Sequence, residues 1–263
     1  MSVKLMHSLL PPSVYNQRKS VEGKSEVKSF LLIGQSNMAG RGDFGEVQAI
    51  ENEHCFMLRN GRWQPMSEPI NPDRSVFPVG ELKIHSGIGL SASFADAYEK
   101  KFKEDVGLIP CADGGTKIIQ WQPGEPLYMS AIAQTKLALK ESELAGILWH
   151  QGESDSYSLE NISMYKKWFF TMIYSLKKEL NANDVPLIIG ELGDFVKNYA
   201  NGKYRYYSEM NHVLHELADE IPKCAIATST GLTCRFDSIH FNSASYREFG
   251  IRYFNAYCKV IGG

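Results

Sequence analysis

The sequence has no marked excess of charge of either sign. Its 263 residues include 28 lysines and arginines and 30 aspartates and glutamates, which gives a formal net charge of -2. Proteins that bind nucleic acids or anionic membrane surfaces usually carry a clear positive excess. We therefore expect neither a nucleic acid nor a membrane as partner, and a small neutral molecule suits this charge balance better.

Cysteine is scarce, and long apolar runs are absent. The 5 cysteines are Cys55, Cys111, Cys224, Cys234 and Cys258. They lie far apart, without the paired spacing of a zinc site or a disulfide framework. We interpret them as free thiols, and we predict neither a metal nor an organic cofactor. No apolar run approaches the ~20 residues that cross a bilayer.

The first residues do not have the pattern of a classical secretion signal. A short apolar run ends at Leu10, where Pro11 and Pro12 stop it, and no basic segment precedes a sustained apolar core. On this basis we expect a cytoplasmic protein. The sequence indicates no oligomeric state.

Short apolar runs alternate with longer amphipathic ones, the pattern of a parallel sheet with helices on both faces. The predicted strands are Val27–Ile33, His54–Leu58, Val106–Cys111, Ala145–His150, Leu187–Gly190 and Cys224–Thr228. The predicted helices are Leu90–Phe102, Leu127–Leu144, Tyr157–Leu180, Tyr204–Glu220 and Ser243–Lys259. The fold class is thus α/β, a single doubly wound domain over residues 27–263 that follows an N-terminal extension, 1–26. The segment Asn60–Lys83, rich in Pro, Gly and Asn, is predicted to lack regular structure.

A tight turn follows the first predicted strand. The run from Gly34 to Gly42 places Ser36 where catalytic residues of such folds lie, at the carboxyl end of a strand. Successive backbone N–H groups of the turn can point into the same space, so a nucleophile and part of an oxyanion hole can share it. The alternative is a serine that only caps a helix. The glycine spacing fits neither a P-loop nor a dinucleotide fingerprint.

A serine hydroxyl needs a base to take its proton, and the base needs a third group to orient it. Asp237 and His240, three residues apart after the last predicted strand, are the candidate pair. The alternative is that His240 caps the next helix and Asp237 only forms a turn. His212 and His215 are also three apart, but they lie in an amphipathic helix without a third metal ligand.

Three segments together resemble the SGNH-type hydrolases, in particular the branch with the sialate O-acetylesterases and the acetylxylan esterases of carbohydrate esterase family 6. They are Gly34–Gly40, Trp149–Asp155 and the Asp237-x-x-His240 pair, with Gly250–Arg252 after it. The resemblance covers about Val27 to Tyr253. It implies a flavodoxin-like three-layer sandwich, with residues 27–263 as an SGNH-type esterase domain.

The resemblance also implies roles for further residues. Gln151 stands where other SGNH enzymes have an asparagine that donates to the oxyanion, and Gly87 is expected to donate a backbone N–H beside that of Ser36. The branch often has proline where this chain has Ile88, so the loop that holds Gly87 is less constrained, and Gly89 is the fallback donor. The substrate-binding residues are expected to be Gln35, Asn37, Gly114, Gly115, Thr116, Trp121 and Glu153.

In this interpretation, His240, oriented by Asp237, activates Ser36 to cleave short acyl esters, such as acetyl, of a carbohydrate. Trp121 would stack on the sugar, although core packing is its alternative role. Glu153 and Asp155 are a possible carboxylate pair for glycoside cleavage, but the resemblance indicates that they support the loop of Gln151. The remaining alternatives are a lipase or thioesterase with the same triad, and an esterase-derived carbohydrate-binding protein without turnover.

Overall fold

The computed structural model describes residues 27–76 and 85–262, and the expected extension 1–26 lies outside this part. A 7-stranded sheet runs through it in the order β3-β2-β4-β1-β5-β6-β7. The strands are β1 (Val27–Gly34), β2 (Cys55–Arg59), β3 (Arg62–Pro65), β4 (Val106–Pro110), β5 (Ser142–His150), β6 (Leu187–Gly190) and β7 (Cys224–Ala227). All neighbouring pairs are parallel except β2 and β3. The α/β fold expected from the sequence is confirmed.

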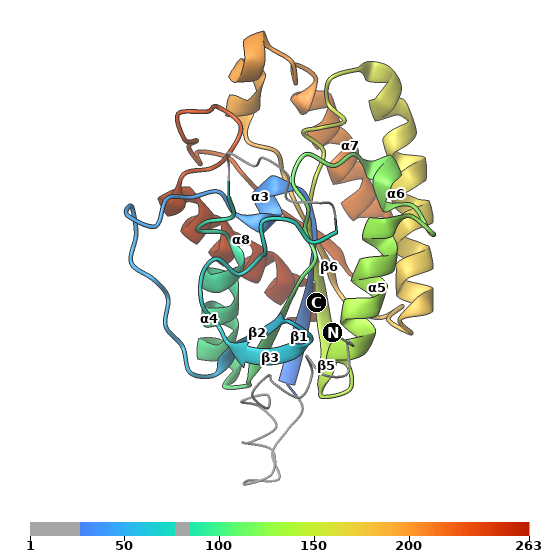
Figure 1. The fold of residues 1–263 in the computed structure, drawn as a ribbon. Coiled ribbons are helices and arrows are strands. Elements are labelled where there is room, and N and C mark those ends of the chain that lie inside the picture. The colour runs from blue at the N-terminus through green and yellow to red at the C-terminus, as the bar shows by residue number, and fades with distance from the viewer. Residues whose placement is uncertain (1–26, 77–84, 263) are drawn as a thin grey trace, which may run out of the picture.

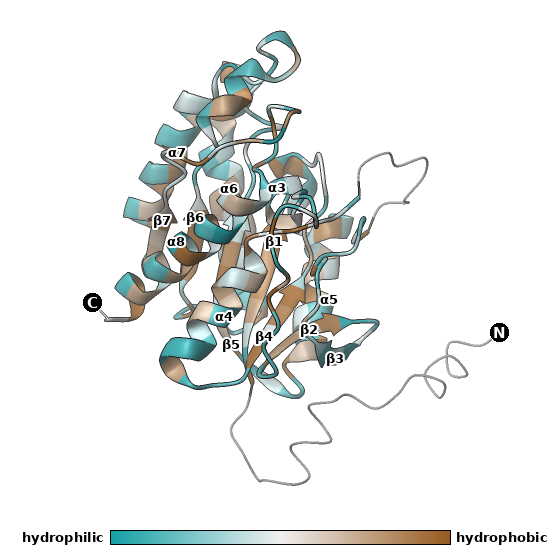
Figure 2. Cartoon of the chain, turned by 90° about the vertical axis from the view of Figure 1, so that its left-hand side faces the viewer, coloured by the Kyte–Doolittle hydropathy of each residue, from teal (hydrophilic) through white to brown (hydrophobic). Residues whose placement is uncertain are grey.

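Helices cover both faces of the sheet (Figure 1). One face carries α4 (Ser91–Phe102) and α8 (Ser243–Gly262), and the other carries α5 (Pro126–Ala138), α6 (Leu159–Glu179) and α7 (Tyr207–Glu220). Shorter helical segments lie in the connections: α3 (Ser36–Ala39), η1 (Ile118–Trp121) and η2 (Asp194–Asn201). The strands are the most apolar part of the chain, and the outer helix faces are hydrophilic (Figure 2).

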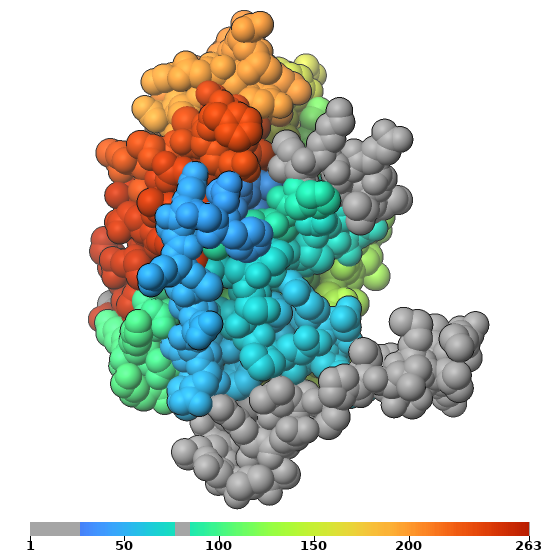
Figure 3. Space-filling view, turned by 60° about the vertical axis from the view of Figure 1, so that its left-hand side comes forward, coloured from blue at the N-terminus to red at the C-terminus, as the bar shows by residue number. Residues whose placement is uncertain are grey.

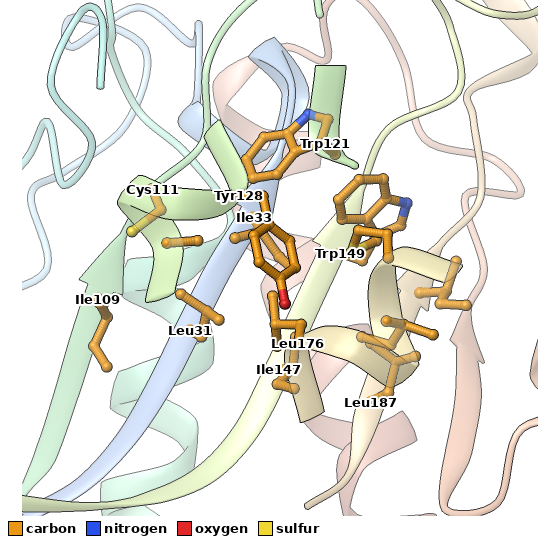
Figure 4. Packing of buried hydrophobic residues seen from close by; sticks show 14 of the residues in the cluster. Leu31, Ile33, Ile109, Cys111, Trp121, Tyr128, Ile147, Trp149, Leu176 and Leu187 are labelled. Carbon is orange, nitrogen blue, oxygen red and sulfur yellow. The ribbon is translucent and has the colours of Figure 1, made fainter. Parts of the chain in front are cut away.

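The central strand β1 contributes to both cores because its side chains alternate between the two faces. Leu31 and Ile33 pack with the α5, α6 and α7 side, and Phe30 and Leu32 pack with the α4 and α8 side. Figure 4 shows Leu31 and Ile33 among aromatic and aliphatic neighbours of the first of these cores. Burial on both faces explains why β1 is a continuous apolar run.

The structure corrects two predictions about local elements. The helix expected over Leu127–Leu144 ends at Ala138, and β5 begins at Ser142. Residues 142–144 pair with the start of β1, and this tertiary pairing overrides an apolar spacing that also suits a helix.

The second correction concerns Asn60–Lys83, where β3 forms a hairpin with β2. Asn60 and Gly61 both have positive φ, 52° and 73°, and they join the Arg59–Arg62 pair. This is the two-residue turn that Asn-Gly favours, so the dipeptide was the signal for the hairpin. Residues 77–83 of the expected irregular segment lie outside the described part.

Candidate active site

A tight turn places Ser36 at the carboxyl end of the central strand. Gly34 has a φ of 132°, and a Cβ at this position would lie 2.1 Å from the carbonyl oxygen of His150. Only glycine allows β1 and β5 to approach so closely here. The Gln35 N–H donates to that carbonyl at 2.9 Å, and α3 then begins at Ser36. The serine is thus presented at the start of a short helix, just beyond the carboxyl ends of the parallel strands.

The candidate base comes from the loop between β7 and α8. Phe241 forms an isolated antiparallel bridge with Cys234, and the Arg235 N–H donates to the carbonyl oxygen of His240 at 2.8 Å. Arg235 also donates from Nη1 to the Arg41 carbonyl, which fastens this loop to the segment after Ser36. Figure 3 shows the segment that follows β1 in contact with this late part of the chain on one face of the molecule.

Ser36, His240 and Asp237 form one chain of hydrogen bonds. The Nε2 atom of His240 lies 2.9 Å from Ser36 Oγ, and its Nδ1 atom lies 2.8 Å from Asp237 Oδ2. Ser36 and His240 are 6% and 7% exposed, so the pair is sheltered but reachable. The distances are those of a nucleophile joined to a base and of a base joined to its orienting carboxylate.

The Asp237 carboxylate is held in its charged form. Burial raises its pKa, but the hydrogen bonds from the His240 ring, the His240 N–H and the Ile239 N–H together lower the pKa to about 2. Its Oδ1 atom accepts the two backbone N–H groups, and Oδ2 faces the imidazole. A fixed anion at Nδ1 keeps the proton there, which leaves Nε2 as the proton acceptor toward Ser36.

Asn37, expected to bind substrate, is instead enclosed by the protein. It is 0% exposed, and its Nδ2 atom donates to the Ile239 carbonyl at 3.0 Å and to Glu153 Oε1 at 2.5 Å. Its Oδ1 atom accepts from Phe241 N–H at 3.3 Å and from Tyr246 Oη at 2.6 Å. No atom of the amide is left for a substrate, because burial and four hydrogen bonds occupy it.

Glu153 is likewise a buried support rather than a substrate ligand. It is 0% exposed, and its Oε1 atom lies 3.3 Å from His150 Nε2. Burial raises its pKa, but His150 and Asn37 outweigh this and hold the pKa below the ordinary value. His150 Nδ1 lies 3.2 Å from Tyr253 Oη, which donates to the Trp149 carbonyl at 2.8 Å. This network links the nucleophile turn to α8.

The structure gives Gln151 other hydrogen-bond partners than an oxyanion. Its Nε2 atom donates to Asp155 Oδ2 at 2.6 Å and to the Thr116 carbonyl at 3.0 Å, and its Oε1 atom accepts from Tyr165 Oη at 2.8 Å. A longer contact of 3.3 Å reaches Gln35 Oε1. Both N–H bonds are therefore used within the protein, and Gln151 fastens the segment that contains Thr116 to the end of β5.

The N–H expected from Gly87 is also taken, because it donates to the Gly40 carbonyl at 3.1 Å. Gly89, the fallback, packs its Cα against Gly40. Gly114 instead lies beside the nucleophile: a Cβ added to it would be 3.6 Å from the Cβ of Ser36. No acceptor in the described part of the chain takes the Gly114 N–H. The Gly114 N–H is thus an unpaired backbone donor near Ser36 among the described residues, whereas the Gly87 N–H is occupied, which corrects the expectation for Gly87.

Trp121 is a core residue and not an open platform for a sugar. It is 0% exposed, stands edge-on to Trp149 with ring centroids 5.5 Å apart, and donates from Nε1 to Thr116 Oγ1 (Figure 4). Thr116 is itself 2% exposed. Four of the expected substrate-binding residues lie between positions 114 and 121. Of these, only Gly114 and Gly115 reach the surface.

No group of three or more metal-ligating side chains occurs in the described ranges. His212 and His215 have separate acidic partners, Glu216 at 3.2 Å and Glu191 at 2.6 Å. The two histidines therefore have different partners and do not form a common site. Within residues 27–76 and 85–262, no helix combines the length and the apolar character needed to cross a bilayer.

Sequence reasoning did not single out Arg41 or Tyr246. Arg41 is 6% exposed, and Tyr246 is fully buried against Asn37. Arg41 lies within the run from Gly34 to Gly42, and a charged residue between two of its glycines was the available signal. Tyr246 resembles any other apolar position of the last helix, and nothing in its spacing marks it.

The chain folds as a mostly parallel sheet between two layers of helices, with a serine turn at the carboxyl end of its central strand. Solved structures share this fold. A protein of Arabidopsis thaliana matches with a TM-score of 0.77 and 25% identity, over 89% of this chain and 99% of that one. NanS matches with a TM-score of 0.71 at 15% identity, over 90% and 98%. A carbohydrate acetylesterase from Xanthomonas citri matches at 0.63 and 18%, over 90% and 57%.

Residues 26–259 match the carbohydrate esterase family described as sialic acid-specific acetylesterase, and the chain belongs to that family. A relative described as a probable carbohydrate esterase, also of Arabidopsis thaliana, is 26% identical over 265 residues, which cover 90% of this chain and 95% of the relative. The protein is therefore a carboxylic ester hydrolase with carbohydrate esterase activity, and membership implies an acetylated carbohydrate as substrate.

Proposed function

We propose that this protein removes acetyl groups from a carbohydrate by covalent catalysis at Ser36, with His240 as general base and Asp237 as the group that orients it. The observation that carries the proposal is the position of His240, 2.9 Å from the serine oxygen and 2.8 Å from the carboxylate. A histidine that only capped α8 would have no need of both contacts.

The first step forms an acyl-enzyme. Ser36 Oγ bonds to the acyl carbon while its proton passes to His240 Nε2, and the π electrons of the carbonyl move onto its oxygen. When the carbonyl re-forms, the sugar oxygen leaves with the electron pair of its bond and takes the proton from His240. Water then repeats the sequence against the acyl carbon, so that acetate leaves and Ser36 is restored.

Two backbone donors support the oxygen that becomes negative. Ser36 is the first residue of α3, so its N–H has no partner within the helix, and none elsewhere in the described part accepts it. The Gly114 N–H, also without a partner there, lies on the neighbouring segment. Donors from two separate elements that meet near a nucleophile are the usual composition of an oxyanion hole.

The test compares Ser36→Ala with Ser29→Ala on an acetylated sugar and on 4-nitrophenyl acetate. Ser29 lies at the other end of β1, buried, with its Oγ atom donating to the Glu143 carbonyl at 3.0 Å. We expect Ser36→Ala to lower kcat at least ~10³-fold without unfolding, and Ser29→Ala to leave kcat within about threefold. Full turnover by a folded Ser36→Ala protein would end the proposal, and binding without turnover by the unmodified protein would favour a carbohydrate-binding role instead.

A further inference from the structure

The site contains a buried cation that the mechanism above does not use. Arg41 lies immediately after the turn of Ser36 and is 6% exposed. One terminal nitrogen of its guanidinium, Nη1, donates to the Gly40 carbonyl at 2.7 Å and to Ser86 Oγ at 3.3 Å. Both acceptors are neutral, so they hold the group in place without cancelling its charge.

No carboxylate in the described part forms an ion pair with Arg41. The nearest acidic groups that act on it, Asp73 and Asp113, are engaged with His85 and with Arg74. Burial lowers the pKa of Arg41, but a guanidinium stays protonated in proteins. A buried charge without a directly paired carboxylate destabilises a fold, and such groups are found preferentially at functional sites.

The free end of the guanidinium lies beside the nucleophile. No acceptor among the described residues takes a hydrogen bond from Nη2. A Cβ added to Gly114 would lie 2.7 Å from this Nη2 atom and 3.6 Å from the Cβ of Ser36. Any side chain at residue 114 would therefore stand between Arg41 and Ser36.

Two of the oxyanion donors expected from the family pattern have hydrogen-bond partners within the protein. The Gly87 N–H is bound to Gly40, and both N–H bonds of the Gln151 amide are bound to Thr116 and Asp155. The backbone N–H groups of Ser36 and Gly114 remain, and neither carries a formal charge. A charged donor in the same space would act more strongly on an oxygen that is becoming negative than a neutral one.

We propose that Arg41 is a further catalytic residue, whose Nη2 donates a charge-assisted hydrogen bond to the carbonyl oxygen of the substrate ester as that oxygen becomes negative. The inference rests on the proposed function of Ser36. As Ser36 Oγ bonds to the acyl carbon, the electron pair that moves onto the oxygen is stabilised by the guanidinium, and it returns when the sugar oxygen leaves. Arg41 gives up no proton at any stage.

The experiment uses the full chain and a small neutral substrate, 4-nitrophenyl acetate, which offers Arg41 no carboxylate to bind. Arg41→Met is expected to lower kcat at least ~10²-fold and to change KM less than about threefold, because the lost interaction belongs to the transition state. Arg41→Lys keeps a positive charge on a side chain of shorter reach. Its kcat should lie between that of the unmodified protein and that of Arg41→Met. Arg59→Met is the matched control, since Arg59 also donates to backbone carbonyls, of Pro69 and Ile70, but lies on the edge-side strand β2.

A second measurement uses methylboronic acid, which binds a serine as a tetrahedral anion and so imitates the charged intermediate. If Arg41 acts as proposed, the inhibition constant of methylboronic acid rises in Arg41→Met by about the factor by which kcat/KM falls. Arg41→Lys supplies the same comparison if Arg41→Met does not fold. An unchanged inhibition constant in a folded variant, or a loss confined to KM, would overturn the inference. In that case a normal loss in Ser36→Ala would leave the serine esterase proposal standing.

Discussion

The side chain of Asn37 holds the peptide groups on both sides of His240. Its Nδ2 atom donates to the carbonyl before that histidine, at Ile239, and its Oδ1 atom accepts from the N–H after it, at Phe241. Glu153 fixes which end of the amide faces which group, because it accepts a second bond from Nδ2. Asn37 thus sets the position of His240, the proposed base.

Replacing Asn37 by alanine is therefore expected to lower kcat by roughly 10- to 100-fold while KM changes less than about threefold, because His240 loses its position but the substrate loses no contact. Initial-rate kinetics on 4-nitrophenyl acetate measure this. Asn211→Ala is the control, since Asn211 holds the N–H and the carbonyl of Leu192 in a similar way, at 2.8 and 3.0 Å. Equal losses of kcat in both variants would point to general destabilisation rather than to positioning.

The requirement for a glycine at position 114 can be tested by comparing Gly114→Ala with Gly115→Ala. Gly114→Ala places a methyl group between Arg41 and Ser36, where it meets the flexible end of an arginine, so we expect the protein to fold and kcat/KM to fall at least ~10²-fold. At Gly115 a Cβ meets nothing within 4 Å, although the φ of 74° makes alanine strained there. Gly115→Ala should thus lose stability, seen as a lower Tm, and keep most activity. The reverse pattern would place the substrate elsewhere.

Much of the fold follows from local pattern because parallel strands buried on both faces are continuous apolar runs. Leu187–Gly190 was predicted with its observed bounds, and all six parallel strands were anticipated. The start of β5 was not, because residues 142–144 read equally well as helix until β1 pairs with them. The hairpin at Asn60 and Gly61 could have been predicted from the Asn-Gly dipeptide. The content of Pro, Gly and Asn in the whole segment indicated only irregular structure.

The site was less predictable for a physical reason: a motif names residues but not the directions in which their side chains point. Gln151 and Asn37 lie in the recognised segments and Trp121 was expected to bind substrate, but all three side chains turn into the protein. Whether a polar side chain meets substrate or backbone depends on partners distant in sequence, such as Tyr165 for Gln151. Spacing within a motif carries no information about such partners.

The carboxyl of Asp155 gives the fold a pH dependence of its own. Burial raises its pKa to about 6, against a smaller opposite effect of the bonds from Gln151 and the Ile118 N–H. Between pH ~4 and ~6 the native state binds more protons than the unfolded chain, so stability falls as pH rises through this window. Below it the contribution is fully present.

Asp155→Asn removes this titration and retains an oxygen that accepts both hydrogen bonds. We expect the variant to exceed the unmodified protein in stability by about 1–3 kcal/mol at pH 8, and to lose that advantage at pH 4. Denaturant melts at the two pH values give the difference. Asp184→Asn, at a carboxyl that is 94% exposed, should show no such change between them. An advantage of Asp155→Asn that is equal at both pH values would contradict the assignment.

The acyl group should be short. Among the described residues, a glycine, Gly114, and a charged side chain, Arg41, lie beside Ser36, and neither offers an aliphatic wall to a longer chain. Each methylene could add up to ~0.8 kcal/mol of binding on an apolar wall, so a lipase-like site would favour long chains. Here we expect kcat/KM to fall at least tenfold from acetyl to hexanoyl 4-nitrophenyl esters. A rising series would move the protein toward the lipid esterases.

The order of the active-site parts along the chain also affects how the protein is made. Ser36 is synthesised early, but His240 follows every strand of the sheet, and α8 after it supplies Phe249, Tyr253 and Tyr257 to the core beneath Phe30. During synthesis from the N-terminus, α4 can cover part of this face early, but the part that α8 covers stays open until α8 has left the ribosome. The same part of the chain completes this core and positions the proposed base, so we expect hydrolysis to begin only once α8 has packed.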